Sequence, residues 1–157
     1  MINVQIPGWG EMEVENLVFD LNGTLATDGK ISPEVKQGLN TLAECASIYI
    51  LTADTHGKAE EQVQGMKKVK LVTIPQEEST GAKLDFLKSL DLTRTAAIGN
   101  GSNDRLILKE AALGIAVLGD EGLSVSAMKS ADVVVRNISD AVSLFLIPKR
   151  LIATLRE

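Results

Sequence analysis

Aromatic side chains are scarce in this chain of 157 residues, because tryptophan, tyrosine and phenylalanine together make up only 3% of it. The core must therefore be built from Val, Ile, Leu and Ala, which suits a parallel sheet that is covered on both faces. The chain offers no row of rings for stacking bases and no cluster of lysine or arginine for a phosphate backbone. We therefore expect no nucleic-acid partner.

Cysteine is almost absent as well, and Cys45 alone cannot form a disulfide within the chain. No apolar run reaches membrane-spanning length, and the first residues lack the basic-then-apolar pattern of a signal peptide. These absences predict a cytoplasmic protein with no membrane partner. The length, the apolar content of 45% and the mild net charge of −5 predict one domain with its own core.

Strand-like apolar runs alternate with segments of helical period along the chain, which is typical of an α/β fold. We predict a single Rossmann-like domain over residues 1–157, with a doubly wound parallel sheet in three α/β/α layers. It comprises an N-terminal hairpin over 1–15, a core over 16–147 and a C-terminal helical tail over 148–157. The predicted core strands are 17–21, 47–52, 70–74, 95–99, 113–119 and 131–135. The predicted helices start at Pro33 after the N-cap Ser32, at 58, at 80 or 81 with Leu84, Leu87 and Leu90 facing inward, at 103, and at 139 with a break at Pro148.

Polar residues follow several of these strands, at the edge of the sheet where α/β proteins bind their ligands. They are Asp20, Asn22 and Thr24, then Thr52 and Asp54, then Asn100, Asn103 and Asp104, with Lys83 early in the helix before the 95–99 strand. Together they supply a candidate carboxylate nucleophile, a hydroxyl, a cation and several oxygen ligands. Such a set is the equipment for phosphoryl transfer with a hard cation.

Each of these residues also has an ordinary structural explanation. Asp20 can cap a turn, Thr52 can be a strand-end hydroxyl, and Lys83 can be a solvated helix lysine. The segment GNGSND can be a glycine turn that caps a helix. All of these would have to coincide at matching strand ends, so the joint pattern favours a functional site. Two other reactive side chains have no visible partner and are interpreted as structural: Cys45 and His56.

Four segments resemble the ordered motifs of the haloacid dehalogenase (HAD) superfamily: FDLNGTLA, LTAD, Lys83 and IGNGSNDRLILKEAALGIAV. The later segment GIAVLGDEGLSVSAMKSADVVVRNISDAVSLF is similar to the end of the phosphorylation domain of P-type ATPases. The chain therefore resembles most the small, free-standing proteins known as soluble P-type ATPases. This resemblance implies a hydrolase that uses Mg²⁺ and forms an aspartyl phosphate on Asp20.

The resemblance also implies a role for each matching residue. The catalytic residues would be Asp20, Asn22, Thr52, Lys83 and Asp104. The phosphoryl oxygens would be held by Asn22, Gly23, Thr52, Ala53 and Lys83, with the backbone N–H groups of Asn22, Gly23 and Ala53 taking part. The Mg²⁺ ligands would be Asp20, the carbonyl of Asn22 and the side chain of Asn100. Lys83 would neutralise the nucleophile and the phosphate, and Asp104 would steady Lys83 or a metal-bound water.

Two positions depart from the pattern of the family's phosphatases, which usually carry aspartate at the positions of Asn22 and Asn100. Asn22 cannot exchange a proton, and general acid–base help is typically worth about 10²–10⁴-fold in rate. We expect slow hydrolysis of ordinary esters, while attack on an activated anhydride remains possible. Asn100 removes a negative charge from the metal site, so Mg²⁺ binding should weaken.

No segment is long enough to hold a cap domain, since 24–52 and 54–83 leave room only for the predicted turn, helices and strand. An open site suits a phosphorylated macromolecule, or a phosphorylated small molecule if neighbouring subunits of a homo-oligomer wall the site. The turn TDGKI and the N-terminal hairpin are the surfaces expected to make such contacts.

The leading hypothesis is a slow, Mg²⁺-dependent hydrolase of phosphate esters or anhydrides. The alternative is a catalytically weak or inactive module that binds phosphate or a partner protein, which the two amides favour. A carbon–halogen hydrolase is less favoured, because it would need an apolar cap. A two-component receiver domain shares the Asp, Thr and Lys set, but its acceptor follows a middle strand, so the order of the motifs here does not fit. ATP-driven transport is excluded, because the sequence has no membrane span and no room for a nucleotide domain.

Overall fold

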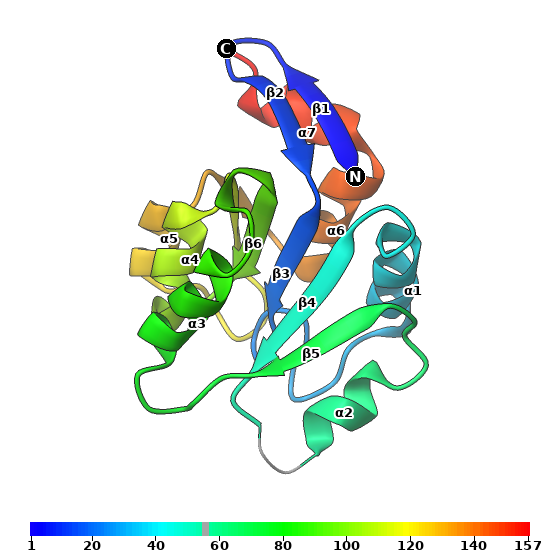
Figure 1. Ribbon diagram of the computed structural model, residues 1–157, viewed down its shortest axis with the longest axis vertical. Helices are drawn as coiled ribbons and strands as arrows, with labels where there is room; N and C mark the ends of the chain where they lie inside the picture. Colours follow the sequence, from blue (N-terminus) through cyan, green and yellow to red (C-terminus); the bar gives the residue numbers. More distant parts are fainter. Residues whose placement is uncertain (55–56) are drawn as a thin grey trace.

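The computed structural model describes residues 1–54 and 57–157, and a twisted parallel sheet lies at its centre (Figure 1). Within the described residues, this sheet has six strands in the order β5-β4-β3-β6-β7-β8, and β1 and β2 pair as a separate antiparallel hairpin. The strands are β1 (Ile2–Ile6), β2 (Gly10–Val14), β3 (Asn16–Asp20), β4 (Ser47–Thr52), β5 (Val69–Thr73), β6 (Thr95–Gly99), β7 (Leu113–Val117) and β8 (Val133–Val135). The predicted α/β/α fold with a parallel sheet is confirmed.

Helices cover both faces of the sheet. The α-helices are α1 (Pro33–Leu42), α2 (Lys58–Val63), α3 (Ser79–Lys88), α4 (Arg105–Glu110), α5 (Val125–Ser130), α6 (Ile138–Leu146) and α7 (Pro148–Leu155). Helices α1, α2 and α6 belong to the apolar cluster on one face, and α3, α4 and α5 belong to the cluster on the other. Helix α7 packs on α6 and on the hairpin strand β1, at one end of the molecule (Figure 1).

The alternation of side chains along β3 decides which helices its final residue meets. Leu17 and Phe19 are fully buried in the α1/α6 cluster, whereas Val18 is fully buried in the α3/α4 cluster. Successive strand residues point to opposite faces, so Asp20 shares the face of Val18. The carboxylate that ends the strand therefore turns toward α3 and α4.

The strand order places two candidate motifs side by side. From β3 the chain moves to β4 on one side, and β6 later pairs with β3 on the other side, with Phe19 opposite Ile98. This reversal of strand order between β3 and β6 is a topological switch point, where open α/β sheets bind ligands beyond the carboxyl ends of the strands. Asp20 ends β3, and Asn100 follows β6 directly.

Helix α1 forms as its sequence predicts. Ser32 accepts a hydrogen bond from the N–H of Val35 at 3.3 Å, and Pro33 occupies the first helical position. A proline is suited to that position because its missing N–H would have no partner there. Val35, Leu39 and Leu42 are buried on one face, which holds the helix against the sheet.

Two sequence expectations were wrong. Helix α5 was not predicted, because its apolar residues Val125 and Met128 are exposed and give no amphipathic period. In α3, Leu87 is fully buried as predicted, but Leu84 is only half-buried and does not join the α3/α4 cluster; Leu90 follows the end of α3 and packs, half-buried, against that cluster. The reason is that Lys83 takes the buried position one turn before Leu87, because positions four apart share a face of a helix.

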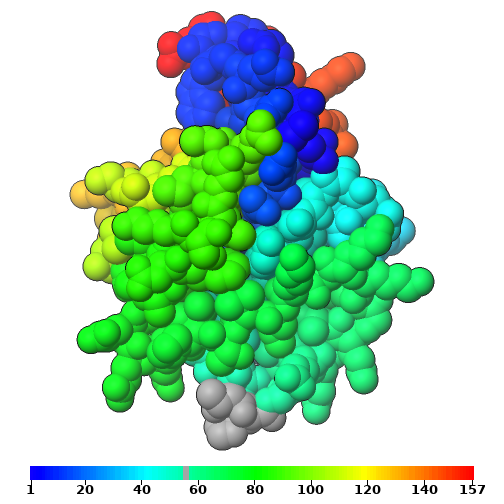
Figure 2. All heavy atoms as spheres, viewed as in Figure 1, coloured from blue at the N-terminus to red at the C-terminus, as the bar shows by residue number. Residues whose placement is uncertain are grey.

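The rest of the fold leaves the carboxyl edge of the sheet open. Between β3 and α1, the described residues form turns with a bridge between Thr27 and Lys30, and the part of the chain described here contains no cap domain. The hairpin and α7 lie at the opposite end of the molecule (Figures 1 and 2). Among residues 1–54 and 57–157, no helix combines the length and apolar character that a bilayer crossing requires.

Candidate active site

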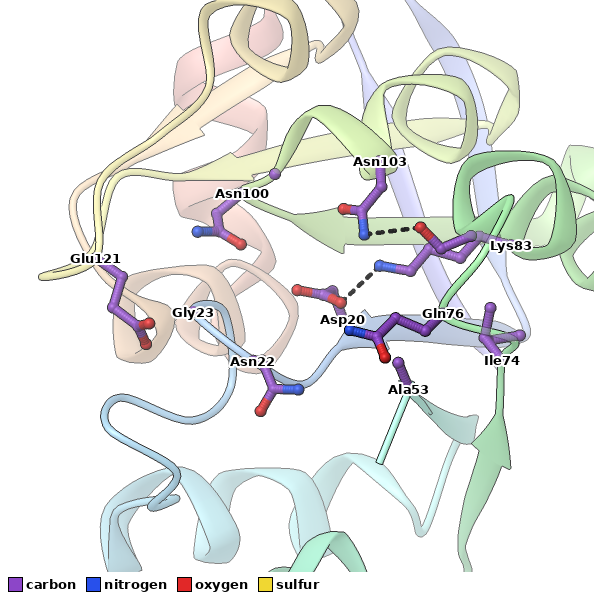
Figure 3. A pocket seen from close by; sticks show the side chains of 12 residues that line it. Asp20, Asn22, Gly23, Ala53, Ile74, Gln76, Lys83, Asn100, Asn103 and Glu121 are labelled. Carbon is purple, nitrogen blue, oxygen red and sulfur yellow. Dashed lines mark hydrogen bonds and ion pairs between the residues drawn. The ribbon is translucent and has the colours of Figure 1, made fainter. Parts of the chain in front are cut away.

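A cavity of about 400 Å³ opens at the switch point between β3 and β6 (Figure 3). It is lined by Asp20, Asn22, Gly23, Ala53, Ile74, Gln76, Ser79, Lys83, Asn100, Gly101, Asn103 and Glu121. Seven of the candidate residues, including Asn103, therefore meet in one place, although they come from four separate segments of the sequence.

A buried ion-pair group forms the floor of the site. The Nζ of Lys83 lies 2.7 Å from Asp20 Oδ1 and 2.7 Å from Asp104 Oδ1. Lys83 is 4% exposed, Asp20 8% and Asp104 0%, so water screens these charges little. Such a cation between two carboxylates fixes the orientation of Asp20 toward the cavity.

Asp104 also shapes the loop that carries Asn100. Its Oδ2 accepts hydrogen bonds from the N–H groups of Asn100 at 3.0 Å and Gly101 at 2.9 Å. A Cβ on Gly99 would lie 2.5 Å from the Asp104 carboxyl carbon, so only glycine leaves room for this arrangement. One carboxylate therefore links the position of Lys83 to the position of Asn100.

Burial and neighbouring charges shift the pKa values of Asp20 and Lys83. Burial raises the pKa of Asp20 to about 6, and the charge of Asp104 adds to the rise, while Lys83 and Thr24 lower it. Burial opposes the charge of Lys83, but Asp20 and Asp104 outweigh it and hold the pKa of Lys83 above its usual value. At neutral pH, Asp20 is therefore mostly ionised and available as a nucleophile.

The buried hydroxyl of Thr24 brings the expected metal ligands together. Its oxygen lies 3.1 Å from Asp20 Oδ2 and 3.0 Å from Asn100 Oδ1, so its single hydrogen can be donated to either of these oxygens. Carboxylate and carbonyl oxygens are the donors that Mg²⁺ prefers, so the residues fit a hard divalent cation. Within the described ranges, no group of three His, Cys, Asp or Glu side chains could hold a metal, which agrees with amides at positions 22 and 100.

The predicted phosphate-binding residues lie in two different settings. Asn22 is exposed and lines the cavity together with Ala53. Gly23 also lines it, in a left-handed conformation with φ of 79°, but its N–H already donates to the carbonyl of Ala26 at 2.9 Å. That N–H is therefore engaged within the turn in this conformation, and its role toward a phosphoryl oxygen stays a prediction.

Thr52 is buried beneath the cavity and is not part of its lining. Its Oγ1 accepts a hydrogen bond from the N–H of Asp54 at 3.0 Å. The same aspartate accepts one from the N–H of Ala59 at 2.7 Å and so fixes the start of α2.

Several cavity residues were missed by the sequence reasoning. They are Ile74, Gln76, Ser79 and Glu121. Ser79 accepts a hydrogen bond from Asn103 Nδ2 at 3.2 Å, which ties the start of α3 to the loop after β6 (Figure 3). Ile74, Gln76 and Glu121 lie in connections and Ser79 begins α3, so their positions depend on packing, and no local sequence pattern marks them.

The two side chains interpreted as structural have different outcomes. Cys45 is exposed, lies outside the cavity lining, and donates a weak hydrogen bond to the carbonyl of Leu42 at 3.4 Å. His56 lies outside the described residues.

Two curated relatives match the chain, both from Methanocaldococcus jannaschii. The uncharacterized protein MJ0073 is 48% identical over 80 residues, which cover 48% of this chain and 86% of MJ0073. The uncharacterized protein MJ0072 is 62% identical over 39 residues, which cover 25% of this chain and 89% of MJ0072. No family model matches the chain.

Solved structures of similar shape come from HAD phosphatases. The 3-deoxy-D-manno-octulosonate 8-phosphate phosphatase of Moraxella catarrhalis, solved with magnesium, phosphate and KDO, has a TM-score of 0.72, 18% identity, and coverage of 91% of this chain and 94% of that chain. The cobalt-bound enzyme from Haemophilus influenzae has a TM-score of 0.72 and 16% identity, covering 92% of this chain and 90% of its own. The HAD phosphatase BT1666 of Bacteroides thetaiotaomicron has a TM-score of 0.66 and 13% identity, covering 91% and 96%. The chain thus belongs to the same family as MJ0073, and its fold is that of the HAD superfamily.

Proposed function

We propose that this protein is a slow, divalent-metal-dependent phosphohydrolase in which Asp20 is the nucleophile. One observation carries the proposal: Lys83 lies 2.7 Å from both Asp20 and Asp104 at the floor of an open cavity. The cation lowers the cost of bringing a phosphoryl group, which is itself anionic, next to a carboxylate. The nucleophile keeps one oxygen, Oδ2, on the side of Thr24 and Asn100.

The reaction has two displacement steps. An oxygen of Asp20 attacks phosphorus, and the bond to the leaving oxygen breaks with its electron pair, which gives an aspartyl phosphate. Water then attacks the same phosphorus, the bond to Asp20 breaks, and inorganic phosphate leaves while the water proton passes to solvent. Covalent catalysis of this kind divides one difficult hydrolysis into two easier steps.

Asn22 makes both steps slow for ordinary esters. Its exposed side chain lines the cavity beside Asp20, but an amide cannot donate a proton to a leaving alkoxide or accept one from water. A donor whose leaving group needs no proton, such as an acyl phosphate or another anhydride, escapes the first penalty. The substrate class we favour is therefore an activated phosphate.

A divalent cation, for which Mg²⁺ is our choice, would be held by Asp20 Oδ2, the carbonyl of Asn22 and Asn100 Oδ1. When bound, it would neutralise charge on the phosphoryl oxygens. The buried Lys83 would counter the remaining charge from the other side.

The likeness to soluble P-type ATPases supports the same conclusion about the intermediate. The resemblance covers GNGSND and the segment that follows it, and P-type ATPases also lack an acid at the position of Asn22. We propose that the aspartyl phosphate of this protein persists longer than that of a phosphatase with aspartate there.

Phosphate release from acetyl phosphate, ATP and p-nitrophenyl phosphate, measured with and without Mg²⁺, tests the proposal. The wild type should release phosphate only with the metal, fastest from acetyl phosphate, and Asp20→Asn should abolish release. Equal release by Asp20→Asn would overturn the assignment of the nucleophile.

The second candidate is a binding module that recognises phosphate or a partner without turnover. The amides of Asn22 and Asn100 favour it, since they remove a proton shuttle and a metal charge. It is supported if the protein binds Mg²⁺ and phosphate but neither releases phosphate nor forms an adduct with any of the three donors.

A further inference from the structure

We infer that Glu121 supplies the second carboxylate charge of the metal site, in place of the charge that Asn100 lacks. The inference rests on the proposed metal-dependent function. Glu121 lies in the loop between β7 and α5, and it lines the same cavity as Asp20 and Asn100 (Figure 3).

Glu121 is well suited to this role because its carboxylate is not used elsewhere. Among the described lining residues, Asp20 and Glu121 are the acidic ones. Asp104 is fully buried and already holds Lys83 and two backbone N–H groups. Within residues 1–54 and 57–157, the Glu121 side chain has no hydrogen-bond or ion-pair partner. Its charge is therefore free to act on a cation in the cavity.

Asn100 itself positions the loop that carries Glu121. The Nδ2 of Asn100 donates to the carbonyl of Gly122 at 3.2 Å, and the carbonyl of Asn100 accepts from the N–H of Ser124 at 2.9 Å. Ser124 also shares a hydroxyl hydrogen bond of 2.7 Å with Ser102. The residue that would provide a metal oxygen thus holds the loop at two points, Gly122 and Ser124.

The Nδ2 contact needs an amide. An ionised aspartate at position 100 has no hydrogen to donate, and its oxygen would face the carbonyl of Gly122. An amide at position 100 therefore removes one negative charge from the proposed metal site. The same amide holds the loop that carries the negative charge of Glu121. In this view Asn100 and Glu121 act as a pair, and Glu121 positions the cation rather than reacting with substrate.

The sequence supplies a matched control next to Glu121. Asp120 is an exposed carboxylate in the same loop but does not line the cavity. Asp120→Asn and Glu121→Gln remove the same charge from neighbouring positions, so they change the long-range field of the protein about equally. Only a local role for Glu121 separates them.

Calorimetric titration of the purified proteins with Mg²⁺, in the absence of substrate, tests the inference. We expect Glu121→Gln to weaken binding about 10-fold, as is usual when a partner of a metal site is lost. Asp120→Asn should weaken it less than about 2-fold at physiological salt, because the Asp120 side chain does not line the cavity and acts on the cation only through screened solvent. Equal effects of the two substitutions, with binding by the wild type intact, would overturn the inference alone. A wild type that binds no Mg²⁺ would overturn the proposed function and the inference together.

A double substitution tests the coupling with Asn100. In an Asn100→Asp background the metal charge is restored and the hydrogen bond to Gly122 is lost, so Glu121→Gln should cost several-fold less affinity than it does in the wild type. Circular dichroism checks that each variant is folded. Strictly additive effects would contradict the pairing of the two residues.

Discussion

Asn22 lines the cavity, and we propose that it occupies the position of the proton shuttle. Asn22→Asp should raise the hydrolysis of p-nitrophenyl phosphate about 10–100-fold, because an ester leaving group needs a proton. Adduct formation from acetyl phosphate should change little. Since aspartate also activates water, the variant should accumulate less aspartyl phosphate than the wild type. Equal ester rates in the two proteins would show that residue 22 is not at the shuttle position.

The charge of Asp20 should cost the protein stability when no metal is bound. The pKa of Asp20 is about 6 in the folded chain, against an ordinary value of 3.8, mainly because of burial. The folded state therefore holds a proton in this interval that the unfolded chain has released, so stability rises as the pH falls through about 6 toward 4.

Asp20→Asn should remove this dependence. In urea unfolding without metal, we expect the variant to be about 1–3 kcal/mol more stable than the wild type near neutral pH. At a pH of about 4 the two proteins should be nearly equal, since Asp20 is then largely protonated in the folded state. A variant that is less stable than the wild type at neutral pH would contradict this account of the buried charges.

Among the structural elements, the end of β6 controls the site most directly. Gly99→Ala would place a methyl group 2.5 Å from the Asp104 carboxyl group and push it away from Lys83. We expect a loss of about 1–3 kcal/mol in unfolding free energy and a fall in phosphate release of at least about 10-fold.

Gly81→Ala is the matched control on α3, the helix that carries Lys83. A Cβ at Gly81 meets nothing within 4 Å. This substitution should leave activity unchanged and raise stability by up to about 1 kcal/mol, since alanine favours a helix. Equal losses of activity in both variants would mean that the space beside Asp104 is not critical.

The sequence predicted the elements whose side chains repeat with a clear period or carry a cap. Helix α1, with Ser32 and Pro33, and strand β3, with its apolar run, are examples. Helix α5 was missed because its outward face is apolar at Val125 and Met128. The spacing of apolar residues predicts which side of a helix is buried only where the other side is polar.

The part of the candidate site that follows the strands could be predicted, because the carboxyl ends of parallel strands meet at one edge of a sheet. Asp20, Lys83 and Asn100 lie in one cavity, as their positions after and between strands indicated. Glu121 and Gln76 were not predicted, because their loops reach the cavity through tertiary contacts such as the Asn100–Gly122 hydrogen bond. The hydrogen bond from the Gly23 N–H to the carbonyl of Ala26 was likewise not predicted, because it depends on how the turn after β3 folds back.

In the whole molecule, the two surfaces expected to make oligomer contacts, the N-terminal hairpin and the turn of residues 27–31, lie at different distances from the open site. The hairpin strand β2 is followed by Glu15, and Arg94 pairs with Glu13 at 3.0 Å and with Glu15 at 2.8 Å. The hairpin lies far from the carboxyl edge of the sheet, so it cannot cover the site of its own chain (Figure 1). The turn of residues 27–31 lies between β3, which ends in Asp20, and α1. We propose this turn as the contact of a homo-oligomer.

If the protein is a homo-oligomer, light scattering after size exclusion should give a mass at least twice the 16.8 kDa of one chain. Exchanging the exposed charges of this turn, in the double variant Asp28→Lys and Lys30→Asp, should shift the protein toward the monomer without unfolding it. A monomeric wild type would remove the oligomer from the account but leave the chemistry of the site unaffected.

The proposed chemistry depends on the transfer of a phosphoryl group to Asp20. Its most direct test is the intact mass of the protein after brief mixing with acetyl phosphate and Mg²⁺ and an acid quench. We predict a gain of one phosphoryl group on the wild type, its removal by hydroxylamine, and no gain on Asp20→Asn or without the metal. An adduct of the same yield on Asp20→Asn, or a wild type that gains no mass and releases no phosphate, would contradict it.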